Sequence, residues 1–190
     1  DQRIGPKFLK ASVGFGGSCF QKDILNLVYL CKHYGLEEVA EYWHQVVKIN
    51  DYQKNRFAQK IIDHFDKDLK EKKIAILGWA FKANTNDSRE SPAIYVSSKL
   101  LEAGASLQIY DPTVAKERII EDLRKVIKEK GFPDNIIKDQ LNQVGIFNNM
   151  ETAIYGSNCI GILTEWDEFK QYNWKLIKHK NIPVFKHMIS

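Results

Sequence analysis

The sequence has few cysteines, no long apolar run and no dense block of charge of one sign. Its three cysteines are Cys19, Cys31 and Cys159, an odd number without paired spacing, which argues against a disulfide framework and fits a reducing compartment. No apolar run approaches the length of a membrane span, and no secretory signal opens the chain. We therefore expect a cytoplasmic protein without a membrane partner.

Charge and histidine spacing exclude two further classes of function. The net charge is +4, which suits an anionic small molecule, but no Lys/Arg block is dense enough to predict a nucleic-acid partner. Lys67–Lys73 and Lys116–Lys130 mix both signs, so we expect both to form solvated surface. The five histidines lack metal-ligand spacing, and the sequence therefore predicts no metal site.

The most specific segment that is present is the glycine-rich run Val13–Asp23. Three glycines in four positions allow a backbone that bends sharply and lies close against a ligand. Ser18 followed by Gln21 fits the S-x-x-Q capping box, which predicts Ser18 as the N-cap and Cys19 as the first helical residue. The segment therefore predicts a pliable loop that leads directly into a helix.

Cys19 is the candidate nucleophile of this segment. The unsatisfied amides and positive end of a helix favour a thiolate at that position. Asp23 lies four residues further on, so both side chains share one helix face. A thiol and a carboxylate in this arrangement predict a covalent catalytic site. The alternative is that Cys19 is a small packing residue, as most lone cysteines are, and we expect that role for Cys31 and Cys159.

Residues 1–65 are predicted to be a helical segment. The first helix is expected from Cys19 to about His33, with Gly35 as its stop. A second helix is expected from Glu37 to about Phe65, because no proline or glycine interrupts it. That length and its aromatic residues suit a helix that pairs with a symmetry mate, and a purely intramolecular helix is the alternative.

Residues 66–190 alternate between short apolar runs and helical patterns, which predicts a doubly wound, Rossmann-like α/β domain. Strands are expected at 73–78, 107–110, 159–163 and 184–185, and helices at 91–103, 117–130 and 150–155. Ser91 and Pro92 are expected to open the first of these helices as N-cap and first helical residue. Residues 133–149 have weak periodicity and are predicted to be a surface loop.

The segment Gly78–Lys82 follows the first predicted strand, where doubly wound sheets bind their ligands. It is not G-x-G-x-x-G, so it does not predict a dinucleotide cradle. Lys82 would either meet a phosphate or sugar hydroxyl as a point charge or lie in solvent on a turn.

The run Phe8–Asp23 closely resembles the catalytic segment of the UDP-glucose dehydrogenases, especially their animal-type branch, within the UDP-glucose/GDP-mannose dehydrogenase family. Further stretches resemble the family in the same order and cover nearly the whole chain: Asn26–Cys31, Asn50–Gln53, Lys72–Gly78, Ala80–Lys82, Ser88–Ser91, Ile109–Pro112 and Thr164–Trp166. Residues 113–150 match least.

The resemblance implies an oxidoreductase that converts UDP-glucose to UDP-glucuronate with two molecules of NAD. Cys19 matches the cysteine that captures the aldehyde as a thiohemiacetal and then carries the thioester. Asp23 matches an aspartate that helps to activate the hydrolytic water. The 37–65 helix matches a long central helix at a dimer core, so the resemblance implies a homodimer or higher homo-oligomer.

The resemblance also implies binding residues. The sugar nucleotide would be held by Arg3 (from a neighbouring subunit), Phe8, Lys10, Ala11, Ser12, Val13, Gly14, Phe15, Gly16, Phe81 and Lys82. NAD would be bordered by Cys19, Phe20, Gln21, Lys22 and Arg89.

Two departures from the family limit these expectations. The N-terminal NAD-binding domain is not among these residues, so NAD would be bound mainly elsewhere and residues 1–190 alone are expected to be inactive. Lys186–Met188 stand where the family usually has aspartate, glycine and a substrate-binding arginine, so that arginine contact is not expected. A non-catalytic sugar-nucleotide-binding and dimerisation module is the alternative function. A thiol oxidoreductase is disfavoured, because Cys19 has no resolving cysteine nearby in the sequence.

Overall fold

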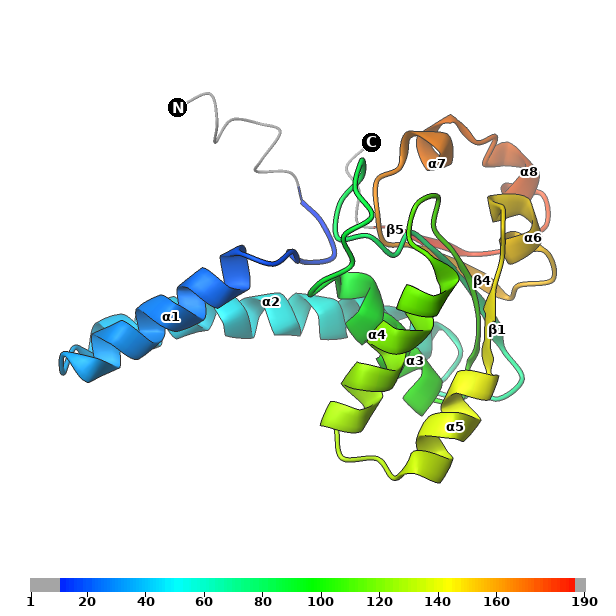
Figure 1. Cartoon of the computed structure of the whole chain (residues 1–190). Coiled ribbons are helices and arrows are strands. Elements are labelled where there is room, and N and C mark those ends of the chain that lie inside the picture. The colour runs from blue at the N-terminus through cyan, green and yellow to red at the C-terminus, as the bar shows by residue number, and fades with distance from the viewer. Residues whose placement is uncertain (1–10, 187–190) are drawn as a thin grey trace.

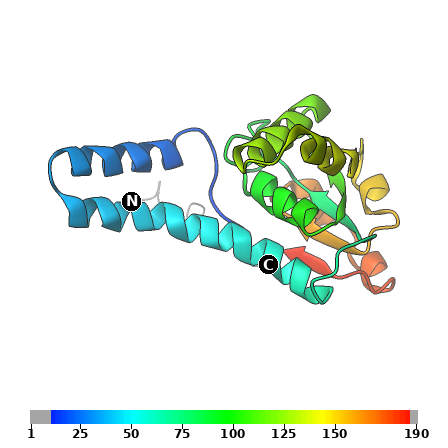
Figure 2. The ribbon, with the colours of Figure 1, turned by 90° about the horizontal axis from the view of Figure 1, so that it is seen from below.

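The computed structural model describes residues 11–186, which form a helical hairpin joined to an α/β unit (Figure 1). Helices α1 (Phe20–His33) and α2 (Glu37–His64) run alongside each other in the hairpin (Figure 2). Gly35 has a φ of +70°, which lets the chain leave α1 and turn into α2. The two expected helices are thus confirmed, and α2 is uninterrupted over 28 residues.

Helix α2 belongs to two hydrophobic cores. Its first half buries Ala40 and Val47 against Ile24 and Val28 of α1. Its second half buries an apolar face that includes Phe57 in the core of the α/β unit. One continuous helix therefore fixes the hairpin to the sheet and holds the start of α1 next to the α/β unit.

The sheet has five parallel strands in the order β3-β2-β1-β4-β5. The strands are β1 (Lys73–Leu77), β2 (Ser106–Tyr110), β3 (Val144–Ile146), β4 (Cys159–Ile162) and β5 (Val184–Lys186). This is the start of the Rossmann order, and the direction of winding reverses between β1 and β4. The expected doubly wound α/β fold is confirmed.

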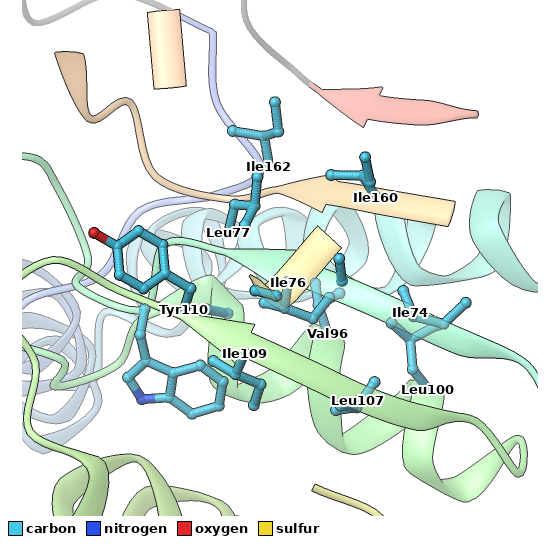
Figure 3. Packing of buried hydrophobic residues seen from close by; sticks show 14 of the residues in the cluster. Ile74, Ile76, Leu77, Val96, Leu100, Leu107, Ile109, Tyr110, Ile160 and Ile162 are labelled. Carbon is cyan, nitrogen blue, oxygen red and sulfur yellow. The ribbon is translucent and has the colours of Figure 1, made fainter. Parts of the chain in front are cut away.

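The core of the α/β unit lies on both faces of the central strands. Every residue of β4 is buried, as are Ile74 to Leu77 of β1, although side chains alternate between the two faces. Figure 3 shows Ile74, Ile76 and Ile109 packed with Val96 and Leu100 of α3. Strands buried on both faces read as continuous apolar runs, which is why the sequence revealed them.

The connecting helices are α3 (Pro92–Glu102), α4 (Lys116–Glu129), α5 (Asp134–Asn142), α6 (Met150–Ile154), α7 (Asp167–Gln171) and α8 (Lys175–Lys178). Ser91 caps α3 as expected, since its side chain accepts a hydrogen bond from the Ala93 amide. Helices α3 and α4 pack side by side, as do α2 and α3, while α6 contacts β1 and β2. Within the described residues, no helix is both long and apolar enough to cross a membrane.

The prediction of a surface loop at 133–149 was wrong, because this segment forms α5 and the sheet strand β3. Strand β3 has three residues with a glycine in the middle, and α5 buries only Ile137, so neither leaves a clear periodic signal. Backbone pairing supplies what the pattern lacks. The Leu107 amide donates to the Gln143 carbonyl at 2.8 Å, and the Phe147 amide donates to the Ile109 carbonyl at 2.9 Å.

The prediction that 116–130 is only solvated surface was also wrong in part. Helix α4 buries an apolar stripe that includes Ile119, Leu123 and Ile127. It also buries one acid, Asp122, which is 6% exposed. A buried carboxylate requires hydrogen-bond partners, and those partners belong to the candidate site.

Candidate functional site

The loop that follows β1 is held in place by Asp111, which comes directly after β2. Asp111 Oδ2 accepts hydrogen bonds from the Trp79 amide at 2.6 Å, the Ala80 amide at 3.0 Å and the Trp166 indole at 3.1 Å. Its Oδ1 accepts from the Thr113 and Val114 amides, both at 2.9 Å. One buried carboxylate thus ties together the loops after β1, β2 and β4 at the carboxyl edge of the sheet.

A second buried acid holds the far end of this loop. Asp122 Oδ2 accepts hydrogen bonds from the Ser88 hydroxyl and from the Trp79 indole at 3.1 Å, while Arg118 donates to Oδ1 at 2.9 Å. Across the point where the winding reverses, the Thr164 hydroxyl donates to the Ala80 carbonyl at 2.6 Å. The segment 78–91 is therefore a rigid platform, and such switch points are where α/β sheets bind ligands.

The glycine-rich segment lies directly on this platform. The Gly17 amide donates to the Arg89 carbonyl at 2.7 Å. A Cβ on Gly16 would lie 2.5 Å from the Glu90 carbonyl oxygen, and a Cβ on Gly17 would lie 3.1 Å from the Phe81 ring. Gly17 also has a φ of +93°, so both the close approach and the backbone conformation require glycine here.

Asn50 of α2 anchors the same segment from the other side. Its Oδ1 accepts from the Phe15 amide at 2.8 Å, and its Nδ2 donates to the Phe15 carbonyl at 3.0 Å. Asn50 is only 3% exposed, so this pair of bonds replaces water for both the amide and the backbone. The loop is consequently fixed to the hairpin and the sheet at once.

The predicted capping box does not form. Helix α1 begins at Phe20, Cys19 is its N-cap, and no side chain caps the helix. Gln21 instead reaches across to the platform, where its Nε2 donates to Glu90 Oε2 at 3.2 Å. The local pattern was outcompeted by a tertiary contact with a charged acceptor, which is a stronger hydrogen bond than a neutral one.

Cys19 is exposed at the end of α1, so it is not a core residue. Its Sγ lies 3.4 Å from the Ser18 hydroxyl. Asp23 is also exposed, and its amide donates to the Cys19 carbonyl at 2.8 Å, which places the two residues one helical turn apart. Cys19 thus presents an accessible thiol at the positive end of α1.

Cys19 opens onto a groove of about 610 Å³ between the start of α1 and helices α3 and α4. Its lining residues are Gly17, Ser18, Cys19, Gln21, Lys22, Leu25, Arg89, Glu90, Ile94, Tyr95, Arg118, Asp122, Lys125, Val126 and Glu129. Four cations and three acids line the groove, and Arg118 pairs with Asp122 and Lys125 with Glu129. Within the described residues, Lys22 and Arg89 are the two lining cations that make no ion pair with another lining residue. The groove lining includes the predicted cofactor residues Cys19, Gln21, Lys22 and Arg89 but not Phe20, whose ring packs on Phe15.

Arg89 is oriented by Asp87. Its Nε donates to Asp87 Oδ1 at 2.9 Å and its Nη2 to Oδ2 at 2.8 Å. The Arg89 hydrogen bond holds the pKa of Asp87 below its usual range, and the same contact raises the pKa of Arg89, with a smaller contribution from the nearby Cys19. This fork holds the Arg89 guanidinium in one orientation at the groove, paired with a carboxylate.

The predicted sugar-nucleotide residues are only partly placed. Arg3, Phe8 and Lys10 lie outside the described residues. Ala11 and Ser12 are exposed, whereas the Val13 side chain is 3% exposed and packs into the main core. Gly14, Phe15 and Gly16 are half-buried beside the platform.

Phe81 and Lys82 lie where the glycine-rich segment meets the platform. Phe81 contacts the glycines, and Lys82 is exposed with its Nζ 5.3 Å from the Phe81 ring centroid. Within residues 11–186, no group of three or more His, Cys, Asp or Glu side chains gathers as a metal site would require.

The other two cysteines are buried, as expected. Cys31 is 7% exposed in the hairpin core, and Cys159 is fully buried in β4. Burial raises the pKa of the Cys159 thiol to about 12, so this thiol stays protonated and inert at neutral pH. Among the three thiols, Cys19 alone is accessible.

Sequence reasoning missed the roles of Asn50, Glu90, Asp111 and Asp122. All four are polar residues with little or partial exposure that hold backbone or side-chain donors of the site. The signal was present in part, because three of them lie in stretches quoted above for the family resemblance. Each of the four has at least one partner 31 to 69 residues away in the chain, beyond the reach of a local pattern.

The fold and the groove define a class: a Rossmann-like α/β unit joined to a helical segment that presents an accessible thiol. The model of the UDP-glucose/GDP-mannose dehydrogenase family's UDP binding domain matches residues 75–187, and that of its central domain matches residues 1–52. The chain belongs to the UDP-glucose/GDP-mannose dehydrogenase family.

Curated relatives agree. Over 97% of this chain, the "UDP-glucose 6-dehydrogenase" of Mus musculus is 51% identical and the "UDP-glucose 6-dehydrogenase 3" of Arabidopsis thaliana is 52% identical. The alignments cover 36% and 39% of those two proteins, so the chain spans just over a third of their length.

Solved structures show the same fold. A UDP-glucose dehydrogenase from Pyrobaculum islandicum matches with a TM-score of 0.69 and 29% identity over 92% of this chain and 35% of its own. A GDP-mannose dehydrogenase from Pseudomonas aeruginosa has a TM-score of 0.64 at 21% identity, over 87% of this chain and 35% of its own, which supports the fold alone.

Proposed function

We propose that this chain carries the thiol nucleophile and the UDP-binding unit of an NAD-dependent oxidoreductase that converts UDP-glucose to UDP-glucuronate. The observation that supports it most is the position of Cys19, which is exposed at the start of α1 beside the platform at the carboxyl edge of the sheet. The relatives named above act, by their names, on UDP-glucose. Thiol chemistry and UDP binding would then meet in one cleft.

Cys19 would act on the sugar at the aldehyde stage. Its thiolate attacks the aldehyde carbon, the carbonyl π bond opens, and the oxygen takes up a proton to give a thiohemiacetal. Loss of a hydride and a proton from that adduct gives a thioester. NAD, when bound, supplies the hydride acceptor for each of the two oxidations. Lys22 and Arg89, which line the groove, would contact the diphosphate of such a cofactor.

Asp23 would serve the hydrolytic step. It lies one turn of α1 from Cys19 and is exposed, so a water can lie between the two side chains. Asp23 takes a proton from that water while the water oxygen attacks the thioester carbon, and the thiolate of Cys19 leaves. The products are the carboxylate and the regenerated cysteine.

The sugar nucleotide would be held between the glycine-rich segment and the platform. Residues 11–16 would contact the sugar nucleotide from one side and Phe81 and Lys82 from the α/β unit, with Arg3, Phe8 and Lys10 as further proposed contacts. NAD would be bound mainly outside residues 1–190, because these residues contain no G-x-G-x-x-G cradle. We also propose a domain boundary near residue 65, between the helical segment and the UDP-binding unit.

The hairpin would form a homodimer or a higher homo-oligomer. Helices α1 and α2 expose large apolar side chains, among them Tyr29 at 66%, Tyr34 at 74% and Tyr42 at 69%. Several large apolar side chains exposed on one helical hairpin favour an interaction site there. A second copy would cover it by the symmetric pairing that the long helix permits.

Two measurements test the proposal. Calorimetric titration of the 190-residue chain should show UDP binding that Lys82→Ala weakens and Lys175→Ala, a distant exposed lysine, does not. In the complete polypeptide that carries these residues, Cys19→Ala should abolish formation of the sugar acid. Asp23→Asn should slow it at the hydrolytic step and let the thioester accumulate, which mass spectrometry detects. Full turnover by Cys19→Ala would rule out the covalent route.

A further inference from the structure

Glu90 has an unusual backbone conformation and central contacts in the candidate site, but the proposed reaction assigns it no role. Its backbone has a φ of +53°, in the left-handed region that non-glycine residues rarely adopt. Its carbonyl oxygen is the atom against which Gly16 packs. Its side chain points away from that contact toward α1 and α3. A strained residue in the centre of a candidate site is a reason to ask what it holds.

The Glu90 carboxylate receives two donors on one oxygen. Gln21 Nε2 of α1 donates to Oε2 at 3.2 Å, and the Tyr95 hydroxyl of α3 donates to the same Oε2. Burial first, and then this hydrogen bond, raise the pKa of Tyr95 above its usual range, so Tyr95 remains a donor throughout the neutral range. Tyr95 therefore fixes the carboxylate, and the carboxylate fixes Gln21.

Tyr95 is itself immobilised by a buried cation. Lys54 of α2 is 2% exposed, its Nζ lies 3.9 Å from the centroid of the Tyr95 ring, and it pairs with Asp51 at 2.7 Å. A desolvated cation over an aromatic face is attracted by the ring electrons, so the contact restrains the ring. The chain of contacts runs from α2 through α3 and the platform to the first turn of α1.

The Gln21 amide has no other described anchor. Its Oε1 is buried yet has no hydrogen-bond partner within residues 11–186, so the bond from Nε2 to Glu90 alone orients the side chain. Gln21 lies two residues after Cys19, in the turn that no capping side chain secures. The usual device for fixing a helix start is thus absent, and a contact from the other unit takes its place.

We propose that Glu90 is a positioning residue, which, held by Tyr95, clamps Gln21 and so fixes the first turn of α1 and Cys19 against the α/β unit. The inference rests on the proposed function for its catalytic meaning. The clamp itself is a property of the fold and can be measured without turnover.

The first test is amide hydrogen exchange in the 190-residue chain. Glu90→Ala and Gln21→Ala should each speed exchange of the Asp23 amide, which donates to the Cys19 carbonyl, by about tenfold, the loss of one charge-assisted hydrogen bond. The double variant should exchange no faster than either single variant, because both remove the same contact. Glu90→Gln should stay within about threefold of wild type, since its Oε1 can accept from both donors.

Glu129→Ala is the matched control, because Glu129 lines the same groove and makes no hydrogen bond to α1 within the described residues. It should leave Asp23 exchange unchanged. Additive effects of the two single variants, or equal acceleration of amides in β1, would overturn the clamp, since both indicate general destabilisation.

The second test is kinetic and separates the two proposals. In the complete polypeptide, Glu90→Ala should lower kcat about tenfold or more with KM for UDP-glucose within about twofold, and Glu90→Gln should restore kcat. An unchanged kcat in Glu90→Ala would overturn the positioning role although Cys19 remains the nucleophile. Wild-type protein without turnover would instead refute the proposed function, and the exchange measurement would still decide the clamp.

Discussion

The two units of the molecule solve the problem of burial differently. The α/β unit covers both faces of its central strands and satisfies its buried acids internally, as Asp111 and Asp122 show. The hairpin buries one narrow stripe between α1 and α2 and leaves tyrosines and leucines exposed on its outer faces. The α/β unit therefore encloses an apolar core, whereas the hairpin leaves much of its apolar surface exposed, and the candidate site lies where the two meet.

The largest expected effect concerns the thiols of the two units. Iodoacetamide at pH 8 should modify Cys19 at least about a thousandfold faster than Cys159, because Cys159 reacts only when the α/β core opens. Peptide mass spectrometry after timed quenching measures both rates, and in denaturant the two should react alike. Comparable rates in the native protein would contradict the closed core.

The raised pKa of the Cys159 thiol also makes the stability of the fold depend on pH. The folded pKa is raised from 9.0 to about 12, so the folded state holds the proton more tightly than the unfolded state. Its contribution to stability is complete below pH 9 and is lost as the pH rises toward 12. Replacing Cys159 with Ala should flatten that alkaline loss.

The next largest effect is expected at the carboxyl edge of the sheet. Asp111→Ala removes the acceptor of three backbone or indole donors on Oδ2 and should lower the free energy of unfolding by about 3 kcal/mol or more. Asp87→Ala, in the loop after β1 that Asp111 holds, removes a partly exposed pair with Arg89 and should cost below about 1 kcal/mol. Denaturant titration compares the two, and equal costs would show that the Asp111 network does not support the platform.

Gly16, at the junction of the two units, and Gly35, at the turn of the hairpin, require glycine for different reasons. Gly16→Ala would push a Cβ to 2.5 Å from the Glu90 carbonyl and should cost about 2 kcal/mol while speeding exchange of the Gly17 amide. A Cβ on Gly35 would meet nothing within 4 Å, so Gly35→Ala is strained only by the φ of +70°. It should lower the free energy of unfolding by about 1 kcal/mol. Unaltered Gly17 exchange in Gly16→Ala would mean that the loop is not seated on the platform.

The sequence predicted the elements well where the physics is local. Apolar runs such as Ile74–Leu77 become buried parallel strands, and Ser91 with Pro92 opens α3, because strand burial and helix capping depend on neighbouring residues. It failed for β3, whose three residues are held mainly by pairing with β2. A strand that depends on a distant partner leaves no periodic pattern of its own.

The candidate site was predictable only in its first half. Cys19, Asp23 and the glycines could be chosen from spacing and resemblance, but their supports could not. The capping box at Ser18 and Gln21 failed because Glu90, 69 residues away, offers Gln21 a charged acceptor. Asn50 and Asp111 likewise act through partners that only the folded chain brings near.

A smaller effect separates backbone strain from side-chain function at Glu90. Glu90→Gly relieves the φ of +53° while Glu90→Ala retains it, so the glycine variant should be more stable by about 1 kcal/mol. Both remove the carboxylate, and both should speed Asp23 exchange. Thermal unfolding combined with amide exchange distinguishes the two consequences. A glycine variant no more stable than the alanine variant would show that the left-handed backbone stores no strain.

The smallest effect on folding, and the sharpest contrast between the units, is expected from two exposed tyrosines. Tyr42 on α2 is 69% exposed and Tyr155 after α6 is 81% exposed, so replacing either with Ser should change the free energy of unfolding at low protein concentration by only about 0.5 kcal/mol. The two variants should differ in self-association.

If a second copy covers the hairpin, Tyr42→Ser should shift the sedimentation-velocity distribution at micromolar concentration toward the monomer. An aromatic side chain buried in an interface contributes more to the free energy of binding than it does to the folding of the isolated chain. Tyr155→Ser should leave the sedimentation distribution as in wild type, since Tyr155 lies on the α/β unit and not on the hairpin. Equal shifts in both variants, or a wild-type chain that is monomeric throughout, would refute the hairpin as the association surface.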